Sequence, residues 1–209
     1  EMCIRDSCSG LIMDMAKETN ISEAERIEAV ASHMREIIRL LGEDPDREGL
    51  IKTPMRSAKA LWKATEGYRK NSESIVNGAL FENPGRDIVT VNDIEFYSMC
   101  EHHILPFFGK VSIAYLPGDK IIGLSKLARL VDLFARRLQL QERFTSELCE
   151  EIGRVTGARG VMVLSRAEHL CMKMRGVEKQ GASTVIVETS GLFSTDDNMR
   201  ARAMSLLTL

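Results

Sequence analysis

The sequence predicts an α+β fold, with an antiparallel sheet packed against two helices and preceded by an N-terminal helical region. Before residue 87, apolar residues recur at three- and four-residue spacing, which is typical of amphipathic helices. From there onward, segments of β-rich composition appear. The order of helices, strands, helices and strands lacks the regular strand–helix alternation of a parallel sheet and therefore favours α+β.

The N-terminal helical region is predicted over residues 21–86. Ser22 and Glu25 form a capping box at the start of a first helix, which continues to Gly42. A second helix begins with Thr53 as its N-cap and a proline in the first helical position.

That second helix is expected to end at Gly67, and residues 71–87 are expected to form a loop. Residues 1–20 lack periodicity, so we interpret them as a disordered or non-native leader.

The second region, residues 87–209, carries the predicted sheet. Its expected elements follow one another in this order: strands over 88–97 and 110–116, a helix from Ser125, a helix carrying Phe144 and Leu148, strands over 160–174 and 183–189, and a short polar helix after Asp196.

Composition and charge exclude several classes of protein. The chain has 209 residues and a net charge of −2, which argues against a general nucleic-acid binder. It has no run of about 18 apolar residues, so no membrane-spanning helix is expected. Its five cysteines, an odd number, argue against a disulfide framework and favour a reducing compartment, the cytoplasm.

A metal site is indicated by two short segments. Cys100 precedes His102 and His103, and Cys and His three residues apart can bind one ion from a single turn. His169 and Cys171 are two apart on a predicted strand, so both side chains would enter one pocket. Spacing alone leaves open whether His102 or His103 binds the metal.

A Cys/His/Cys set provides three ligands and leaves a fourth position for water, the pattern of a catalytic zinc site. A cysteine can instead be a small buried hydrophobic residue with no metal. We prefer this interpretation for Cys149, which lies beside the apolar stripe of its helix. Other divalent ions would also accept this type of ligand set.

Two further segments could bind an anion and a base. Ser125, as N-cap, and Lys126 and Arg129, on one helix face, suit a phosphate site, although a solvated cationic face is the alternative. Glu142 at the next helix start could accept the two adjacent donors of guanine, or could simply complement the helix dipole. Arg175 follows Cys171 and could clamp a phosphate near the metal.

Together these segments resemble the GTP cyclohydrolase I family. The resemblance extends from about Ile21 to the C-terminus and is carried by CEHH, GLSK, QER and HLCMKMRG, in that order, with DREGLIKTPMR upstream. The leader through about Asn20 has no counterpart in the family pattern, and the tail from Ala201 matches it only loosely.

The resemblance implies roles for individual residues. It implies zinc ligands at Cys100, His103 and Cys171, and acid/base or positioning groups at His102 and His169. For GTP it implies the following contacts: guanine at Glu142 with Gln141 nearby, and ribose and triphosphate at Ser125, Lys126, Arg129, Arg175 and, from a neighbouring subunit, Arg56.

The resemblance also implies the reaction and the assembly. GTP and water would give 7,8-dihydroneopterin triphosphate and formate. The implied tunnelling fold pairs subunits edge to edge into a homodecamer with active sites between subunits. Two alternatives stay open: another tunnelling-fold enzyme acting on a pterin or deazapurine, and a non-catalytic, zinc-stabilised oligomer that binds nucleotide.

Overall fold

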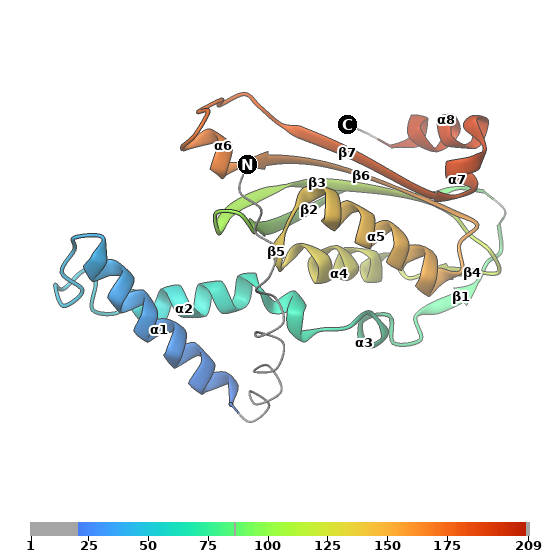
Figure 1. Ribbon diagram of the computed structural model, residues 1–209. Coiled ribbons are helices and arrows are strands. Elements are labelled where there is room, and N and C mark those ends of the chain that lie inside the picture. The colour runs from blue at the N-terminus through green and yellow to red at the C-terminus, as the bar shows by residue number, and fades with distance from the viewer. Residues whose placement is uncertain (1–20, 86, 208–209) are drawn as a thin grey trace, which may run out of the picture. The chain divides into compact units, whose positions relative to one another are not determined.

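The computed structural model describes residues 21–85 and 87–207, and it confirms the α+β fold class (Figure 1). The chain divides into two compact units, which are described separately: one ends at Trp62 and the other begins at Lys63. The predicted boundary near residue 86 stays a prediction. Among the described residues, no helix combines the length and the apolar character needed to cross a membrane.

The first unit contains α1 (Glu23–Leu40) and most of α2 (Thr53–Ala64). The capping box is confirmed, because Ser22 Oγ accepts from the Glu25 backbone N–H at 3.3 Å and the Glu25 carboxylate accepts from the Ser22 N–H at 2.7 Å. α2 begins at Thr53 itself and ends earlier than predicted. A tighter 3₁₀ turn, η2 (Glu66–Arg69), follows it.

The second unit is built on a five-stranded sheet in the order β5-β2-β3-β6-β7. All neighbours are antiparallel except the short β5, which runs parallel to β2. The strands of this sheet are β2 (Val89–Cys100), β3 (Leu105–Leu116), β5 (Leu138–Gln139), β6 (Gly160–His169) and β7 (Thr184–Gly191).

The loop predicted over residues 71–87 is wrong. It contains α3 (Ser72–Val76), which the Asn71 side chain caps, and β1 (Leu80–Glu82), which pairs with β4 (Lys120–Ile122). Polar capping residues and three-residue strands give too short a periodic signal to separate such elements from a loop.

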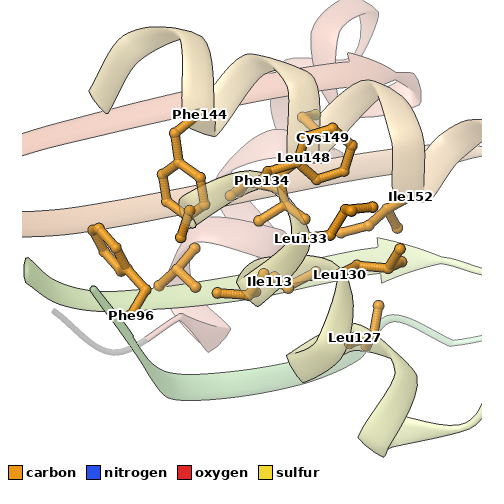
Figure 2. Packing of buried hydrophobic residues seen from close by; sticks show 14 of the residues in the cluster. Phe96, Ile113, Leu127, Leu130, Leu133, Phe134, Phe144, Leu148, Cys149 and Ile152 are labelled. Carbon is orange, nitrogen blue, oxygen red and sulfur yellow. The ribbon is translucent and has the colours of Figure 1, made fainter. Parts of the chain in front are cut away.

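Helices α4 (Leu124–Ala135) and α5 (Gln141–Thr156) cover one face of the sheet (Figure 1). Apolar side chains from both helices meet those of β2 and β3 in a buried core (Figure 2). The Phe144 ring, for example, packs 4.7 Å from that of Phe96. The opposite face is covered at one end by α7 (Leu192–Thr195) and α8 (Asp197–Leu206).

Two element boundaries near the predicted site differ from expectation. The strand predicted over 160–174 ends at His169 and continues as a helical turn, α6 (Leu170–Lys173). The N-cap of α4 is Gly123 rather than Ser125, which lies within the first helical turn.

Candidate metal centre and active site

Cys100, His103 and Cys171 lie together. Their ligand atoms all fall within 4.8 Å of one another, and Cys100 Sγ lies 3.9 Å from His103 Nδ1. Cys100 is the last residue of β2, His103 lies in the turn that leads to β3, and Cys171 lies in α6. Cys100 is buried, Cys171 half-buried and His103 exposed, so the cluster opens to solvent on one side.

Strand register explains how distant segments reach this point. β3 lies between β2 and β6, and its first residues pair with Cys100 on one side and with His169 on the other. The prediction that Cys171 shares a strand face with His169 is wrong, because the strand ends at His169. The helical turn of α6 brings Cys171 to Cys100 instead.

The donor set of this cluster fits zinc. Two cysteine sulfurs and one imidazole nitrogen are typical zinc ligands, and three protein ligands leave a coordination position for water. Burial, together with the neighbouring Cys100, raises the pKa of the Cys171 thiol. A divalent cation would offset that cost, because a coordinated thiol is deprotonated outright.

Two arginines contact the turn that carries His103. Arg143, in the first turn of α5, forms a bidentate pair with Glu101 at 2.7 and 2.9 Å. Arg175 donates to His103 Nε2 at 3.0 Å, since a guanidinium has no acceptor. No role was predicted for Arg143 or Glu101 from the sequence, although their opposite charges lie within the QER and CEHH segments.

His169 is held separately from the three-residue cluster. Its ring stacks on Phe107, with the centroids 4.7 Å apart and the planes 2° from parallel. Its Nε2 lies 2.9 Å from Gln141 Oε1. Burial lowers the pKa of His169, and the negative charge of Glu142 opposes this shift.

A model of the family described as GTP cyclohydrolase I matches residues 30–208. The chain belongs to the GTP cyclohydrolase I family. A relative named GTP cyclohydrolase 1, from Chromohalobacter salexigens, is 51% identical over 86% of this chain and 98% of its own length. GTP cyclohydrolase 1 1 from Pseudomonas aeruginosa is 50% identical over 86% of this chain and 96% of its own length. GTP cyclohydrolase 1 from Deinococcus radiodurans is 51% identical over 82% of this chain and 79% of its own length.

Among the residues predicted to bind ribose and triphosphate, Arg175 reaches the metal cluster of this GTP cyclohydrolase I family chain, but the group at the start of α4 does not. Ser125, Lys126 and Arg129 lie at the start of α4, whereas the end of α4 leads into β5, which pairs beside Cys100. A helix of this length spans about 17 Å, so the two groups lie at opposite ends of the sheet's helical face.

The other predicted residues are placed as follows. His102 is exposed beside the metal cluster, and Glu142 is exposed in the first turn of α5. Gln141 is buried, with 1% of its surface accessible. Arg56 lies on α2 in the first unit, so its predicted phosphate contact stays a prediction.

Proposed function

We propose that the protein is a zinc-dependent GTP cyclohydrolase I of the cytoplasm, which converts GTP and water to 7,8-dihydroneopterin triphosphate and formate. The observation that carries this proposal is the Cys100–His103–Cys171 cluster, which lies at the same end of the central strands as His169. The names of close relatives support the same activity.

Zinc would be held by Cys100, His103 and Cys171, and when bound it supplies a water molecule that ionises near neutral pH. His169 exchanges a proton with the imidazole ring of the purine as that ring opens. Its lowered pKa makes its protonated form a stronger acid, which suits proton delivery to a weakly basic ring nitrogen. His102, which is exposed beside the cluster, is the second candidate for proton exchange.

Glu142 selects the base. Its exposed carboxylate can accept from N1–H and the 2-amino group of guanine together, and adenine lacks this pair of donors. A site built to bond both donors should therefore reject ATP strongly. Ser125, Lys126, Arg129 and Arg175 would hold the ribose and the triphosphate.

We further propose that the complete site forms between copies of the chain, in a homo-oligomer that we expect to be a decamer. The separation of Lys126 and Arg129 from the metal cluster supports this, because one chain does not surround the whole substrate. β7 lies at one edge of the sheet, where Val185 and Val187 are 41% and 39% exposed and are available for contact with another copy.

The activity is tested by formate release from GTP with zinc-replete protein, next to the Cys171→Ala variant. We expect a loss of bound zinc and a more than about 100-fold loss of formate release, since even changes around metal ligands cost 10–100-fold. Cys149→Ala is the matched control, because this buried thiol lies away from the cluster. A zinc-loaded wild-type protein that releases no formate would refute the proposal.

The shared site is tested by mixing two inactive variants, Cys171→Ala and Lys126→Ala, under conditions that allow subunits to exchange. If each site takes its metal residues and its phosphate residues from different copies, random mixing restores about a quarter of the sites. Continued inactivity of the mixed oligomer would show instead that one chain supplies both groups.

A further inference from the structure

The side chain of Gln141 lies in a buried polar network behind His169. Its amide nitrogen lies 3.2 Å from the Ser165 carbonyl oxygen, 3.0 Å from Ser165 Oγ and 3.1 Å from the Thr184 carbonyl oxygen. Three acceptors therefore surround one end of the amide, and His169 Nε2 lies 2.9 Å from the other end.

These partners determine which way the amide points. In the reverse orientation, the amide oxygen would face two backbone carbonyl oxygens, and neither can donate a hydrogen bond. Oε1 must therefore face His169, and it can only accept. His169 Nε2 consequently donates, which leaves the lone pair of the neutral ring on Nδ1.

Two hydroxyl groups support this arrangement. The hydroxyl of Thr145 donates its one proton to the backbone carbonyl oxygen of Gln141 at 2.7 Å. In the 2.8 Å contact between the two hydroxyls, Ser165 must then be the donor and Thr145 Oγ1 the acceptor. Ser165 Oγ is left as an acceptor for the Gln141 amide. Thr145 and Ser165 are both fully buried, so water does not compete for these bonds.

We propose that Gln141 is a positioning residue for the reaction, which acts through His169 rather than on the base of the substrate. With Ser165 and Thr145 it fixes the His169 ring so that Nε2 donates to Gln141 and the lone pair of the ring stays on Nδ1. The stacked Phe107 ring fixes the plane of the imidazole. This role rests on the proposed function and differs from the guanine contact that the resemblance implies.

Steady-state kinetics of Gln141→Leu separate the two roles. A positioning role predicts that kcat for formate release falls about tenfold with KM for GTP within about twofold, since one oriented hydrogen bond is lost. In a His169→Ala background, the same substitution should then change kcat less than about twofold. A rise in KM, or effects that multiply in the double variant, would overturn the proposal.

Thr156→Ala is the matched control for general destabilisation. Thr156 is also buried on α5, and its hydroxyl bonds the Ile152 carbonyl oxygen at the far end of the helix. We expect this variant to unfold more readily than the wild type but to keep its kcat. An equal loss of kcat in Thr156→Ala would show that destabilisation alone explains the Gln141→Leu result.

A second measurement needs no turnover. In full-chain protein labelled with ¹⁵N-histidine, two-bond ¹H–¹⁵N correlations distinguish a ring with its proton on Nε2 from one with its proton on Nδ1. We expect His169 to show the Nε2–H form in the wild type and a mixture of forms in Gln141→Leu. An Nδ1–H form in the wild type, or the same pattern in the variant, would refute the proposal.

The two measurements also keep the proposals apart. If the wild-type protein releases no formate while His169 is a single tautomer that depends on Gln141, the proposed function fails and the positioning network stands. If formate is released but the tautomer does not depend on Gln141, only the positioning role fails.

Discussion

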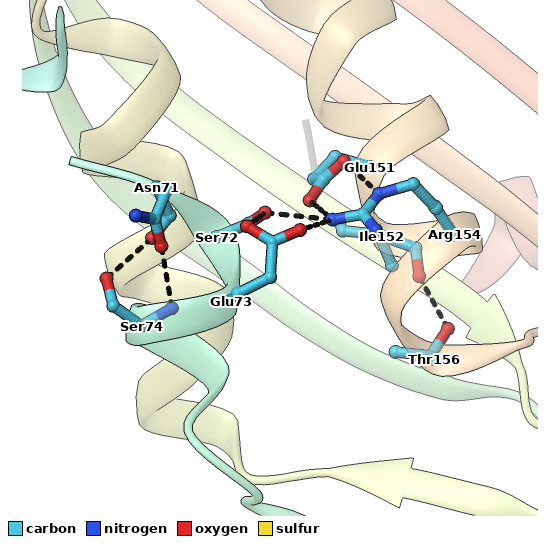
Figure 3. A network of polar contacts seen from close by, with 8 residues as sticks. All are labelled: Asn71, Ser72, Glu73, Ser74, Glu151, Ile152, Arg154 and Thr156. Atoms are coloured by element: carbon cyan, nitrogen blue, oxygen red, sulfur yellow. Dashed lines mark hydrogen bonds and ion pairs between the residues drawn. The ribbon is translucent and has the colours of Figure 1, made fainter.

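The two ends of α5 make similar ionic contacts with different consequences. At the N-terminal end, Arg143 pairs with Glu101 in the turn that carries a predicted metal ligand. At the C-terminal end, Arg154 bonds Glu151 on its own helix at 2.6 Å and Glu73 and Ser72 of α3 at 2.7 and 3.0 Å (Figure 3).

The difference lies in what each arginine holds. Arg143 and Arg154 are both partly exposed, and exposed ion pairs contribute little to folding stability. The segment tethered by Arg143 carries His103, whereas the segment tethered by Arg154 is a short helix that leads to β1. Similar pairs on one helix should therefore affect metal binding at one end and local stability at the other.

The largest expected effect comes from the middle of α5, because the buried side chains there pack the whole helix, including both of its ends, against the sheet. Leu148 is fully buried (Figure 2), so Leu148→Ala should lower the free energy of unfolding by about 2–5 kcal/mol. Denaturant titration measures this change, with Leu40→Ala as control, because Leu40 is 78% exposed. Equal losses in the two variants would contradict the assigned core.

At the N-terminal end, Arg143→Ala should weaken zinc binding about tenfold or more, because the turn that carries His103 loses its bidentate anchor. Competition with a chromophoric chelator measures the affinity. Arg143→Lys should recover only part of it, since an ammonium group cannot form the bidentate pair. Unchanged zinc affinity in Arg143→Ala would remove the difference between the two ends.

At the C-terminal end, Arg154→Ala should lower the denaturant midpoint slightly and leave zinc affinity and formate release unchanged. The substitution frees α3 from α5 but leaves the segments of the metal cluster in place. A loss of zinc affinity similar to that of Arg143→Ala would show that the two ends are coupled.

The smallest expected effect is the pH dependence of the difference in stability between the wild type and Arg154→Ala. The hydrogen bond from Arg154 holds the pKa of Glu151 below its ordinary value of 4.5. Because the folded-state pKa is lowered, the stabilisation is present above pH 4.5 and is lost as the pH falls through the folded-state pKa. Wild type and Arg154→Ala should therefore converge in acid, as followed by denaturant titrations at several pH values. A difference that grows in acid would contradict this sign.

The fold class could be predicted because strand alternation and helical periodicity are set by the local order of apolar and polar residues. The two segments that form the candidate metal cluster were also predicted, since Cys and His at short spacing carry that chemistry locally. Spacing left His102 and His103 undecided, and only the family resemblance implied the set of Cys100, His103 and Cys171. The site residues that follow from long-range packing were harder to predict. The inward position of Gln141 depends on β6 and β7, which lie far along the chain.

Local structure at Cys171 was mispredicted for a related reason. Leu170, Cys171 and Met172 have no pattern that separates a strand end from a single helical turn, and tertiary contacts decide between them. The bond between Arg143 and Glu101 likewise joins segments whose proximity follows only from the pairing of β5 with β2.

The position of β3 between β2 and β6 has a consequence for the order of folding. Cys100 and Cys171 belong to segments that meet only after β3 has paired on both sides, so no short fragment of the chain contains the cluster. Such long-range pairing is slow to form, and a metal ion that binds the cluster would stabilise the assembled sheet by mass action. A metal ion bound there should therefore slow unfolding more than it speeds folding.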